Sequence, residues 1–177
     1  MRKALARGVV WALAALLVAA QPTPASSSPS QATLLADDAY GGALVTRIRE
    51  SKRRIVCAFY LFKAGERRGN LPAGIAAELV RAGRRGVEVT VILEGGKPVG
   101  GENRAAASAL TRGGVRVVFP DRQRVTHAKA VVVDDRYVLI GSHNLTHSAL
   151  ARNNELSVLL DSPELATQVT GYLKGIR

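Results

Sequence analysis

The sequence is poor in the residues that build disulfides and metal sites. Its 177 residues include one cysteine and three histidines. A single cysteine, Cys57, excludes an intramolecular disulfide, and its place in the apolar stretch RRIVCAFYLF predicts a buried thiol rather than a reactive one. No grouping of Asp, Glu, His or Cys has the spacing of a metal site. We therefore expect neither a metal nor another cofactor.

Long hydrophobic runs are also missing. The longest, GVVWALAALLVAA at residues 8–20, is uncharged but shorter than the about 20 residues that a membrane-spanning helix needs. It follows a basic start, MRKALAR, and small and polar residues come after it, which is the order of a secretory signal peptide. We expect cleavage after Ala20, or as late as Ala25, and export of the mature protein to the periplasm or the medium.

The segment after this signal has little apolar content. Residues 21–33 are rich in Pro, Ser, Thr and Gln and predict a flexible linker. Residues 34–177 follow as a single domain, which is long enough to bury a core. No internal repeat is visible in this domain.

Acidic residues are outnumbered, with 14 Asp and Glu against 25 Lys and Arg. Loss of the three basic residues in the signal lowers the formal net charge from +11 to +8. This excess favours a polyanionic partner such as nucleic acid, acidic lipid or a cell-wall polymer, although an arginine-rich solvated surface explains it equally well. Aromatic residues are few, and Phe59, Tyr60 and Phe62 cluster on one predicted strand, which favours a place in the core.

Helical and extended patterns alternate through the domain. The direct link between two extended segments after Val133 predicts a mixed sheet, so the fold class is α/β, with helices flanking a mixed β-sheet. The predicted helices are residues 38–50, 72–86, 103–114 and 162–176, and the predicted strands are 53–62, 87–95, 115–120, 128–133, 137–141 and 154–160.

One stretch, HAKAVVVDDRYVLIGSHN at residues 127–144, places polar groups at both ends of a buried pattern. A hairpin centred near Asp135 would pair residues whose numbers sum to about 270, which brings His127 near His143 and Lys129 near Gly141. The side chains of His127 and Lys129 leave the same face of a strand, because they are two residues apart. The two ends of the stretch therefore meet at one rim of the sheet.

That rim carries the chemistry of an oxyanion site. A histidine can act as nucleophile, acid or base near neutral pH, and a neighbouring lysine supplies fixed positive charge. Ser142 and Asn144 add neutral donors, and Gly141 lets a substrate or a neighbouring backbone come close. Asp134 has the opposite parity and lies at the far end of the strand, so we interpret it as a turn or structural residue. A phosphate fits this set of donors best.

The spacing of these residues resembles the signature of the phospholipase D superfamily. The match comprises H-x-K-x4-D from His127 to Asp134, then G-S-x-N from Gly141 to Asn144, and a glutamate at Glu155 where the family usually has one. The order of elements from about residue 35 onward is similar to that of the family's small, exported, single-motif bacterial endonucleases.

The resemblance implies a two-step phosphoryl transfer without a metal. His127 would attack phosphorus and form a phosphohistidine, while Lys129 and Asn144 hold the non-bridging oxygens and Ser142 supports them. Glu155 would accept a hydrogen bond from the His127 ring nitrogen that is not used in the attack.

This mechanism needs a second histidine, yet no second H-x-K occurs in the sequence. The resemblance implies a homodimer in which the partner's rim completes the site. His143 and His147 are the rival candidates within one chain, and the strand parity of His143 turns it away from Ser142 and Asn144. We favour the second copy of His127.

The substrate is left open between two classes. Small size, export, one motif and positive charge favour a nuclease acting on DNA or RNA, and a phospholipase D-type hydrolase or transferase acting on phospholipids is the alternative. A noncatalytic polyanion-binding module is the third reading. The loop GGKPVGG lacks the G-x4-G-K-[ST] pattern and predicts a plain loop, and Arg67 and Arg68 are candidates for contact with a substrate backbone.

Overall fold

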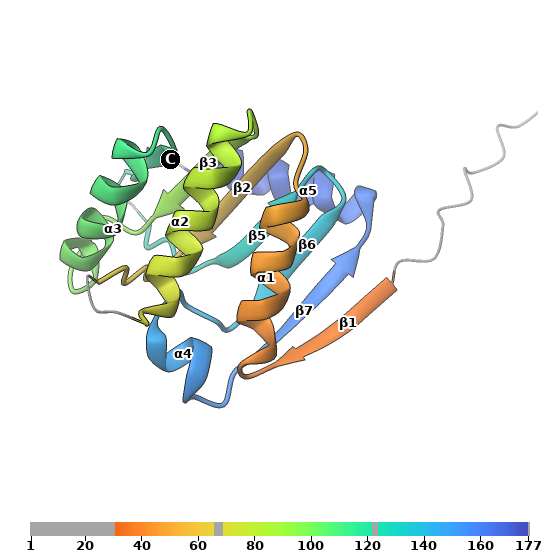
Figure 1. Ribbon diagram of the computed structural model, residues 1–177, viewed down its shortest axis with the longest axis horizontal. Coiled ribbons are helices and arrows are strands. Elements are labelled where there is room, and N and C mark those ends of the chain that lie inside the picture. The colour runs from red at the N-terminus through yellow and green to blue at the C-terminus, as the bar shows by residue number, and fades with distance from the viewer. Residues whose placement is uncertain (1–30, 66–68, 122–123, 177) are drawn as a thin grey trace, which may run out of the picture.

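The computed structural model describes residues 31–65, 69–121 and 124–176 (Figure 1). The expected signal peptide, most of the expected linker and the two arginines of the RR pair at residues 67–68 lie outside these ranges. The strands are β1 (Gln31–Ala36), β2 (Arg54–Phe59), β3 (Glu88–Leu93), β4 (Arg116–Val118), β5 (Lys129–Val133), β6 (Tyr137–Gly141) and β7 (Leu156–Asp161). The helices are α1 (Ala39–Glu50), α2 (Leu71–Arg84), α3 (Gly100–Arg112), α4 (His147–Ala151) and α5 (Pro163–Gly175).

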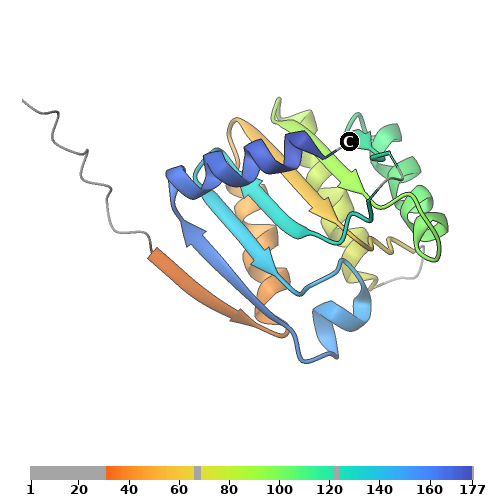
Figure 2. The same cartoon turned by 180° about the vertical axis from the view of Figure 1, so that it is seen from behind.

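All the strands of the described ranges join one sheet in the order β1-β7-β6-β5-β2-β3-β4. β2, β3 and β4 are parallel, whereas β5, β6, β7 and β1 add to them in antiparallel order. α1, α2 and α3 cover one face of the sheet, and α5 crosses the other face (Figures 1 and 2). The predicted mixed sheet flanked by helices is confirmed. None of the helices in the described ranges is long and apolar enough to cross a membrane.

The predicted hairpin is confirmed in its register. Ala130 pairs with Ile140 and Val133 with Tyr137, so the paired residue numbers sum to 270. Alternate residues of β5 serve two cores: Val131 packs under α1–α3, and Val132 packs under α5. Burial on both faces explains why this strand is an almost unbroken apolar run, and it holds the rim in place.

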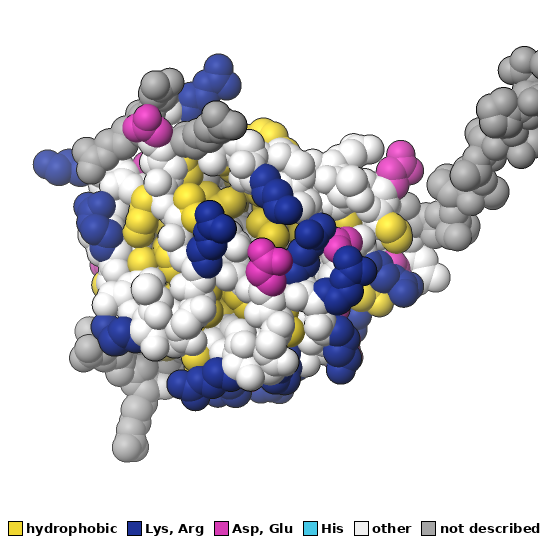
Figure 3. All heavy atoms as spheres, turned by 90° about the horizontal axis from the view of Figure 1, so that it is seen from above, with side chains coloured by type: hydrophobic (Ala, Val, Ile, Leu, Met, Phe, Trp, Pro, Cys, Tyr) yellow, Lys and Arg dark blue, Asp and Glu magenta, His cyan; other side chains and the backbone are white. Residues whose placement is uncertain are grey.

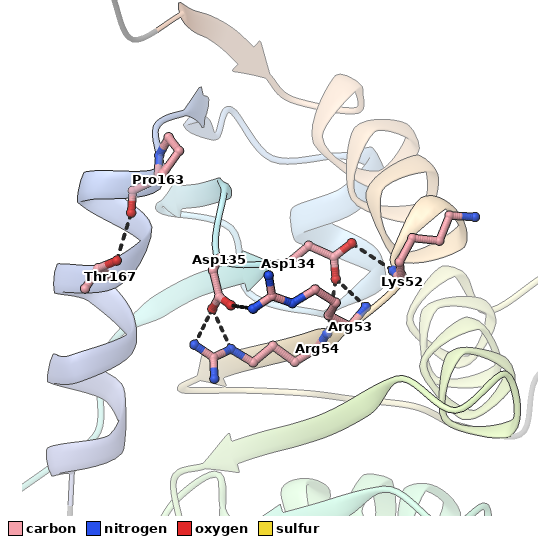
Figure 4. Close-up of polar contacts among 7 residues, drawn as sticks. All are labelled: Lys52, Arg53, Arg54, Asp134, Asp135, Pro163 and Thr167. Atoms are coloured by element: carbon pink, nitrogen blue, oxygen red, sulfur yellow. Dashed lines mark hydrogen bonds and ion pairs between the residues drawn. The ribbon is translucent and has the colours of Figure 1, made fainter. Parts of the chain in front are cut away.

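Asp134 closes the end of the hairpin away from that rim. Its carboxylate accepts hydrogen bonds from the backbone N–H groups of Lys52, Arg53 and Arg54, at 2.8, 2.8 and 3.1 Å (Figure 4). The neighbouring Asp135 pairs with the side chains of Arg53 and Arg54. These contacts agree with our interpretation of Asp134 as a structural residue, because its side chain fixes the start of β2 beside the turn.

Two elements escaped the sequence analysis. β1 begins at Gln31, so residues 31–33, which we expected in the linker, form the outer strand of the sheet beside β7. Only Leu35 of this strand is buried, and backbone pairing rather than a hydrophobic pattern defines it. The five-residue α4 is too short to show helical periodicity and is recognisable only by its N-cap, where Thr146 accepts from the N–H of Ala149.

Candidate active site

His127 and Lys129 lie together where β5 begins. The Lys129 ammonium is 3.0 Å from Nδ1 and 3.3 Å from Nε2 of the His127 ring, and it donates to the His127 carbonyl oxygen at 2.9 Å. Partial burial lowers the pKa of Lys129, and the Glu155 carboxylate opposes this shift. The Lys129 ammonium therefore lies within hydrogen-bond distance of both ring nitrogens of His127.

Tyr60 forms the other side of this pair. Its ring centroid lies 4.6 Å from that of His127, with an angle of 49° between the planes, and 5.5 Å from the Lys129 ammonium. We predicted a core position for Tyr60, and this was wrong: Phe59 and Phe62 are buried, whereas Tyr60 is half-buried at the site. β2 ends at Phe59, so the residue after it leaves the alternation of the sheet.

Asn144 binds the segment that follows Tyr60. Its Oδ1 accepts from the backbone N–H of Leu61 at 3.2 Å, which leaves the Nδ2 amide group to donate to a substrate oxygen. The buried Asn103 fixes the same segment, since it accepts from the N–H of Phe62 at 2.7 Å and donates to the carbonyl of Tyr60 at 2.8 Å. Sequence reasoning missed Asn103, because an asparagine inside a predicted helix gives no signal of its contacts.

Ser142 and Glu155 form a second polar group, just after the end of β6 and just before the start of β7. The Ser142 hydroxyl donates to Glu155, and the Asn153 amide donates to the other carboxylate oxygen at 3.0 Å. Burial alone would raise the pKa of Glu155, but these two hydrogen bonds, with the charges of His143 and Lys129, outweigh it and lower the pKa.

The expected hydrogen bond between Glu155 and His127 is not formed. Within the described ranges, the Glu155 carboxylate is bound by Ser142 and Asn153, and no hydrogen bond joins the His127 ring to Asn144, Ser142 or Glu155. Both carboxylate oxygens of Glu155 accept hydrogen bonds from Ser142 and Asn153, and the His127 ring contacts Lys129 and Tyr60 instead. Glu155 therefore orients the Ser142 hydroxyl, and its negative charge favours the charged form of Lys129.

His143 faces away from the rim, as its parity predicts. It is fully buried, stacks on Tyr40 with ring centroids 4.3 Å apart, and contacts the Ser157 hydroxyl at 2.7 Å and the Asp37 carbonyl at 2.8 Å. We expected Gly141 to give room either to a substrate or to a neighbouring backbone. In the structure it gives room to the backbone, because a Cβ at this position would collide with Leu156 and Ser157 of β7. Gly141 thus serves the pairing of β6 with β7.

A buried carboxylate ties the glycine-rich loop to the segment that leads into β5. Glu94 accepts from the backbone N–H of Gly96 and of Thr126, each at 2.6 Å, and Thr126 directly precedes His127. The loop after β3 is therefore a structural support rather than a phosphate loop. Beside His127, a cavity of about 440 Å³ opens between this segment and α5, and Arg124, Val125 and Tyr172 are among the residues that line it.

The donors gathered at this rim fit a phosphate group. They comprise an imidazole, an ammonium, an amide and a hydroxyl, and within the described ranges no group of three His, Cys, Asp or Glu side chains is placed to hold a metal ion. Among these donors, the Lys129 ammonium supplies positive charge.

Comparisons with known proteins agree with this geometry. A family model described as cardiolipin synthase, phospholipase D-like domain, matches residues 44–177, which include every residue of the rim. Cardiolipin synthase B of Escherichia coli K12 is 29% identical over 134 residues, which cover 73% of this chain and 30% of that protein. Phospholipase D of Rickettsia bellii is 29% identical over 92 residues, which cover 52% of this chain and 45% of that protein.

Among solved structures, the phospholipase D family member Nuc from Salmonella typhimurium superposes with a TM-score of 0.73 at 22% identity. The superposition covers 84% of this chain and 94% of Nuc. The chain thus spans less than half of the curated relatives that it matches, but has the fold of nearly the whole of Nuc.

Proposed function

The chain belongs to the phospholipase D-like domain family, and on that premise we propose that it is a metal-independent phosphodiesterase with His127 as its nucleophile. The observation that carries this proposal is the Lys129 ammonium 3.0 Å from the His127 ring, at the rim to which β6 brings Ser142 and Asn144. This arrangement offers a nucleophile and donors for the phosphoryl oxygens side by side.

In the first step, a lone pair of the His127 ring forms a bond to phosphorus. The bond from phosphorus to the leaving oxygen breaks, and that oxygen takes a proton from a second, protonated histidine. In the second step, this histidine removes a proton from water, the water oxygen bonds to phosphorus, and the N–P bond breaks. The products are an alcohol and a phosphomonoester. Lys129 and the Asn144 amide stabilise the charge on the non-bridging oxygens.

We propose that the second histidine is His127 of a partner copy. His143 is buried and already bonded on both ring nitrogens, which disqualifies it as the acid. His147 is exposed on α4 and is the remaining rival within the chain. A twofold dimer would place two copies of the rim face to face and supply both histidines to one site.

The sheet offers an apolar surface for such a partner. Leu34 and Ile140 both pair with Val158, so the three side chains share one face, and Leu156 lies on the same face two residues before Val158. Ile140 lines a groove of about 260 Å³ beside α5, which identifies the face. In the described ranges, α5 is the one helix on that side and leaves most of β1 and β7 uncovered (Figure 2).

This uncovered surface is exposed and continuous with the site. Leu34, Ile140 and Leu156 have exposed fractions of 63%, 40% and 56%, which is costly for neighbouring apolar side chains on a sheet. Ile140 is followed by Gly141 and Ser142, and Leu156 follows Glu155. A second copy packed on this face would therefore lie next to the rim.

Substitution of this face tests the dimer. We expect Leu34→Asp and Leu156→Asp to yield monomers in sedimentation with little hydrolysis, because an aspartate cannot be buried there without a partner. Leu71→Asp is the matched control, since Leu71 is similarly exposed but begins α2 on the opposite side of the sheet. A wild-type chain that hydrolyses phosphodiesters as a monomer refutes the shared site.

Mixing variants tests whether both copies of His127 act in one site. If they do, a heterodimer of wild type and His127→Ala is inactive, and activity falls with the square of the wild-type fraction. An equal mixture then retains about one quarter of the full rate, whereas independent sites retain about one half. His147→Ala, the matched histidine control, should keep the wild-type rate; its inactivation would assign the acid to His147.

We propose nucleic acid as the substrate class. Arg124 lines the cavity beside His127, where it can contact a phosphate next to the one attacked. Lys and Arg side chains also spread over the end of the molecule where α1 and α2 end, and they outnumber the acidic side chains between them (Figure 3). Several are paired with carboxylates, so this end contributes long-range attraction for a polyanion rather than a second site.

Phospholipid is the second candidate, because the curated relatives quoted above are named cardiolipin synthase B and phospholipase D. The deciding assay offers plasmid DNA, RNA and phosphatidylglycerol vesicles to the same protein in excess chelator, with His127→Ala as the negative control. Cleavage of a nucleic acid supports the proposal, and cleavage of lipid alone overturns the substrate class. Activity that disappears with chelator and returns with a divalent ion overturns the metal-free mechanism.

A further inference from the structure

We propose that the aromatic face of Tyr60 stabilises the positive charge that the His127 ring acquires when it attacks phosphorus. This inference rests on the proposed function, since it concerns the same histidine. The two rings are in contact, with centroids 4.6 Å apart and planes tilted by 49°. An aromatic face attracts a cation within about 6 Å of its centroid.

The backbone of Tyr60 is held from two sides. Its carbonyl accepts from the amide of the buried Asn103 at 2.8 Å. The residue before it, Phe59, pairs with Lys129 in the β2–β5 ladder, and the residue after it, Leu61, donates to Asn144 at 3.2 Å. Three contacts to rigid elements thus set the place from which the Tyr60 ring reaches His127.

The attack creates a charge problem that Tyr60 is placed to solve. The neutral ring donates a lone pair to phosphorus, so the ring carries a positive charge while the electrons of the broken P–O bond leave with the oxygen. The Lys129 ammonium, 3.0 Å from Nδ1, opposes that charge. Glu155 is bound to Ser142 and Asn153 and does not contact the ring. Within the described ranges, Lys129 and Tyr60 contact the His127 ring, and of these two the Tyr60 ring favours the cationic form of His127.

The same face also holds Lys129, whose ammonium lies 5.5 Å from the Tyr60 centroid. Tyr60 therefore attracts both cations of the site and offsets their mutual repulsion. The hydroxyl of Tyr60 has no hydrogen bond within the described ranges, so the ring, and not the hydroxyl, makes the contacts. Tyr60 touches the reacting ring but not the phosphorus, and it acts as a positioning and charge-stabilising residue.

A graded ring series tests this role. Tyr60→Phe keeps the aromatic face and should retain most of kcat, whereas Tyr60→Leu should lower kcat between about 2-fold and 30-fold with little change in KM. Phenylalanine analogues with one, two and three ring fluorines have progressively weaker faces at nearly constant shape. At position 60 they should lower kcat in that order.

Three outcomes overturn the inference. A wild-type kcat in the Leu variant would mean that the face is unimportant. An equal loss in the Leu and Phe variants would assign the role to the hydroxyl, and no trend across the fluorinated series would leave only shape. Tyr137→Leu is the matched control, because Tyr137 also faces cations, Arg47 and Arg136, but at the far end of β6, and its loss should leave kcat unchanged. A wild-type protein with no turnover refutes the proposed function itself, which is a distinct result from a flat series.

Discussion

Replacement of Asp134 should destabilise the fold and leave the chemistry intact. Asp134 belongs to the H-x-K-x4-D motif, but its strand parity and its distance from His127 already favour a structural role. In the structure it lies at the other end of β5 from His127, about 23 Å away at 3.3 Å per residue. Its carboxylate accepts three backbone hydrogen bonds, from Lys52, Arg53 and Arg54 (Figure 4).

The size of the effect follows from those three bonds. A hydrogen bond to a charged group contributes about 1.5–3 kcal/mol when it is shielded from water. The N–H donors of Lys52 and Arg53 are exposed, so water can replace most of the hydrogen bonding that they lose with the carboxylate. The N–H of Arg54 is partly buried, so its lost hydrogen bond contributes its full free energy. Alanine adds about 1 kcal/mol, because residue 134 has a φ of 53°, in the left-handed region. Asp134→Ala should therefore lose about 3–4 kcal/mol.

Chemical unfolding and a thermal melt measure this loss. A domain of this size changes its Tm by roughly 3 °C per kcal/mol, so a decrease of about 10 °C is expected. Asp134→Asn, which tolerates the left-handed backbone and keeps one acceptor, should lose about half as much. Asp161→Asn, whose partner Arg136 is exposed, should have a much smaller effect. Unchanged stability, or a fully folded Asp134→Ala protein without activity, would refute the structural role.

Three further measurements address other parts of the molecule. Hydrogen bonds from Arg81 and Arg49 lower the pKa of Glu78 from 4.5 to about 2, so its stabilisation is complete above pH 4.5 and is lost as the pH falls towards 2. The stability advantage of wild type over Glu78→Gln should shrink in that interval; a constant difference would contradict this. Burial raises the pKa of Cys57 to about 12, so a thiol reagent at pH 8 should label it only as the protein unfolds, and rapid native labelling would contradict its burial. Nucleic-acid binding should weaken steeply with salt, and a flat response would count against that substrate.

The regular part of the fold was predictable because its signals are local. Residues 128–133 alternate between two buried faces, and a short polar link follows them, so the sequence alone predicts both the hairpin and its register. The same reasoning placed Cys57 in the core and turned His143 away from the rim. β1 gave no such signal, since its stabilisation comes from backbone bonds to a strand far away in the sequence.

Side-chain contacts between distant segments were not predictable in this way. The family resemblance implies Glu155 as a partner of His127, but in the folded chain its carboxylate oxygens bind Ser142 and Asn153. Tyr60 was assigned to the core, since nothing local shows that β2 ends at Phe59, three residues before the predicted end of the strand.

The sequence by itself determined which residues we propose for the chemistry: His127 and Lys129, which are two residues apart where β5 begins, and Ser142 and Asn144, which a hairpin returns to them. Only the tertiary structure decided what surrounds them, namely the Tyr60 ring beside the imidazole, the Asn103 and Asn144 amides on the segment after β2, and the bare apolar face at β1 and β7. The physical reason is range. Strand parity and turn length act over a few residues, whereas these contacts join segments that meet only when the sheet assembles.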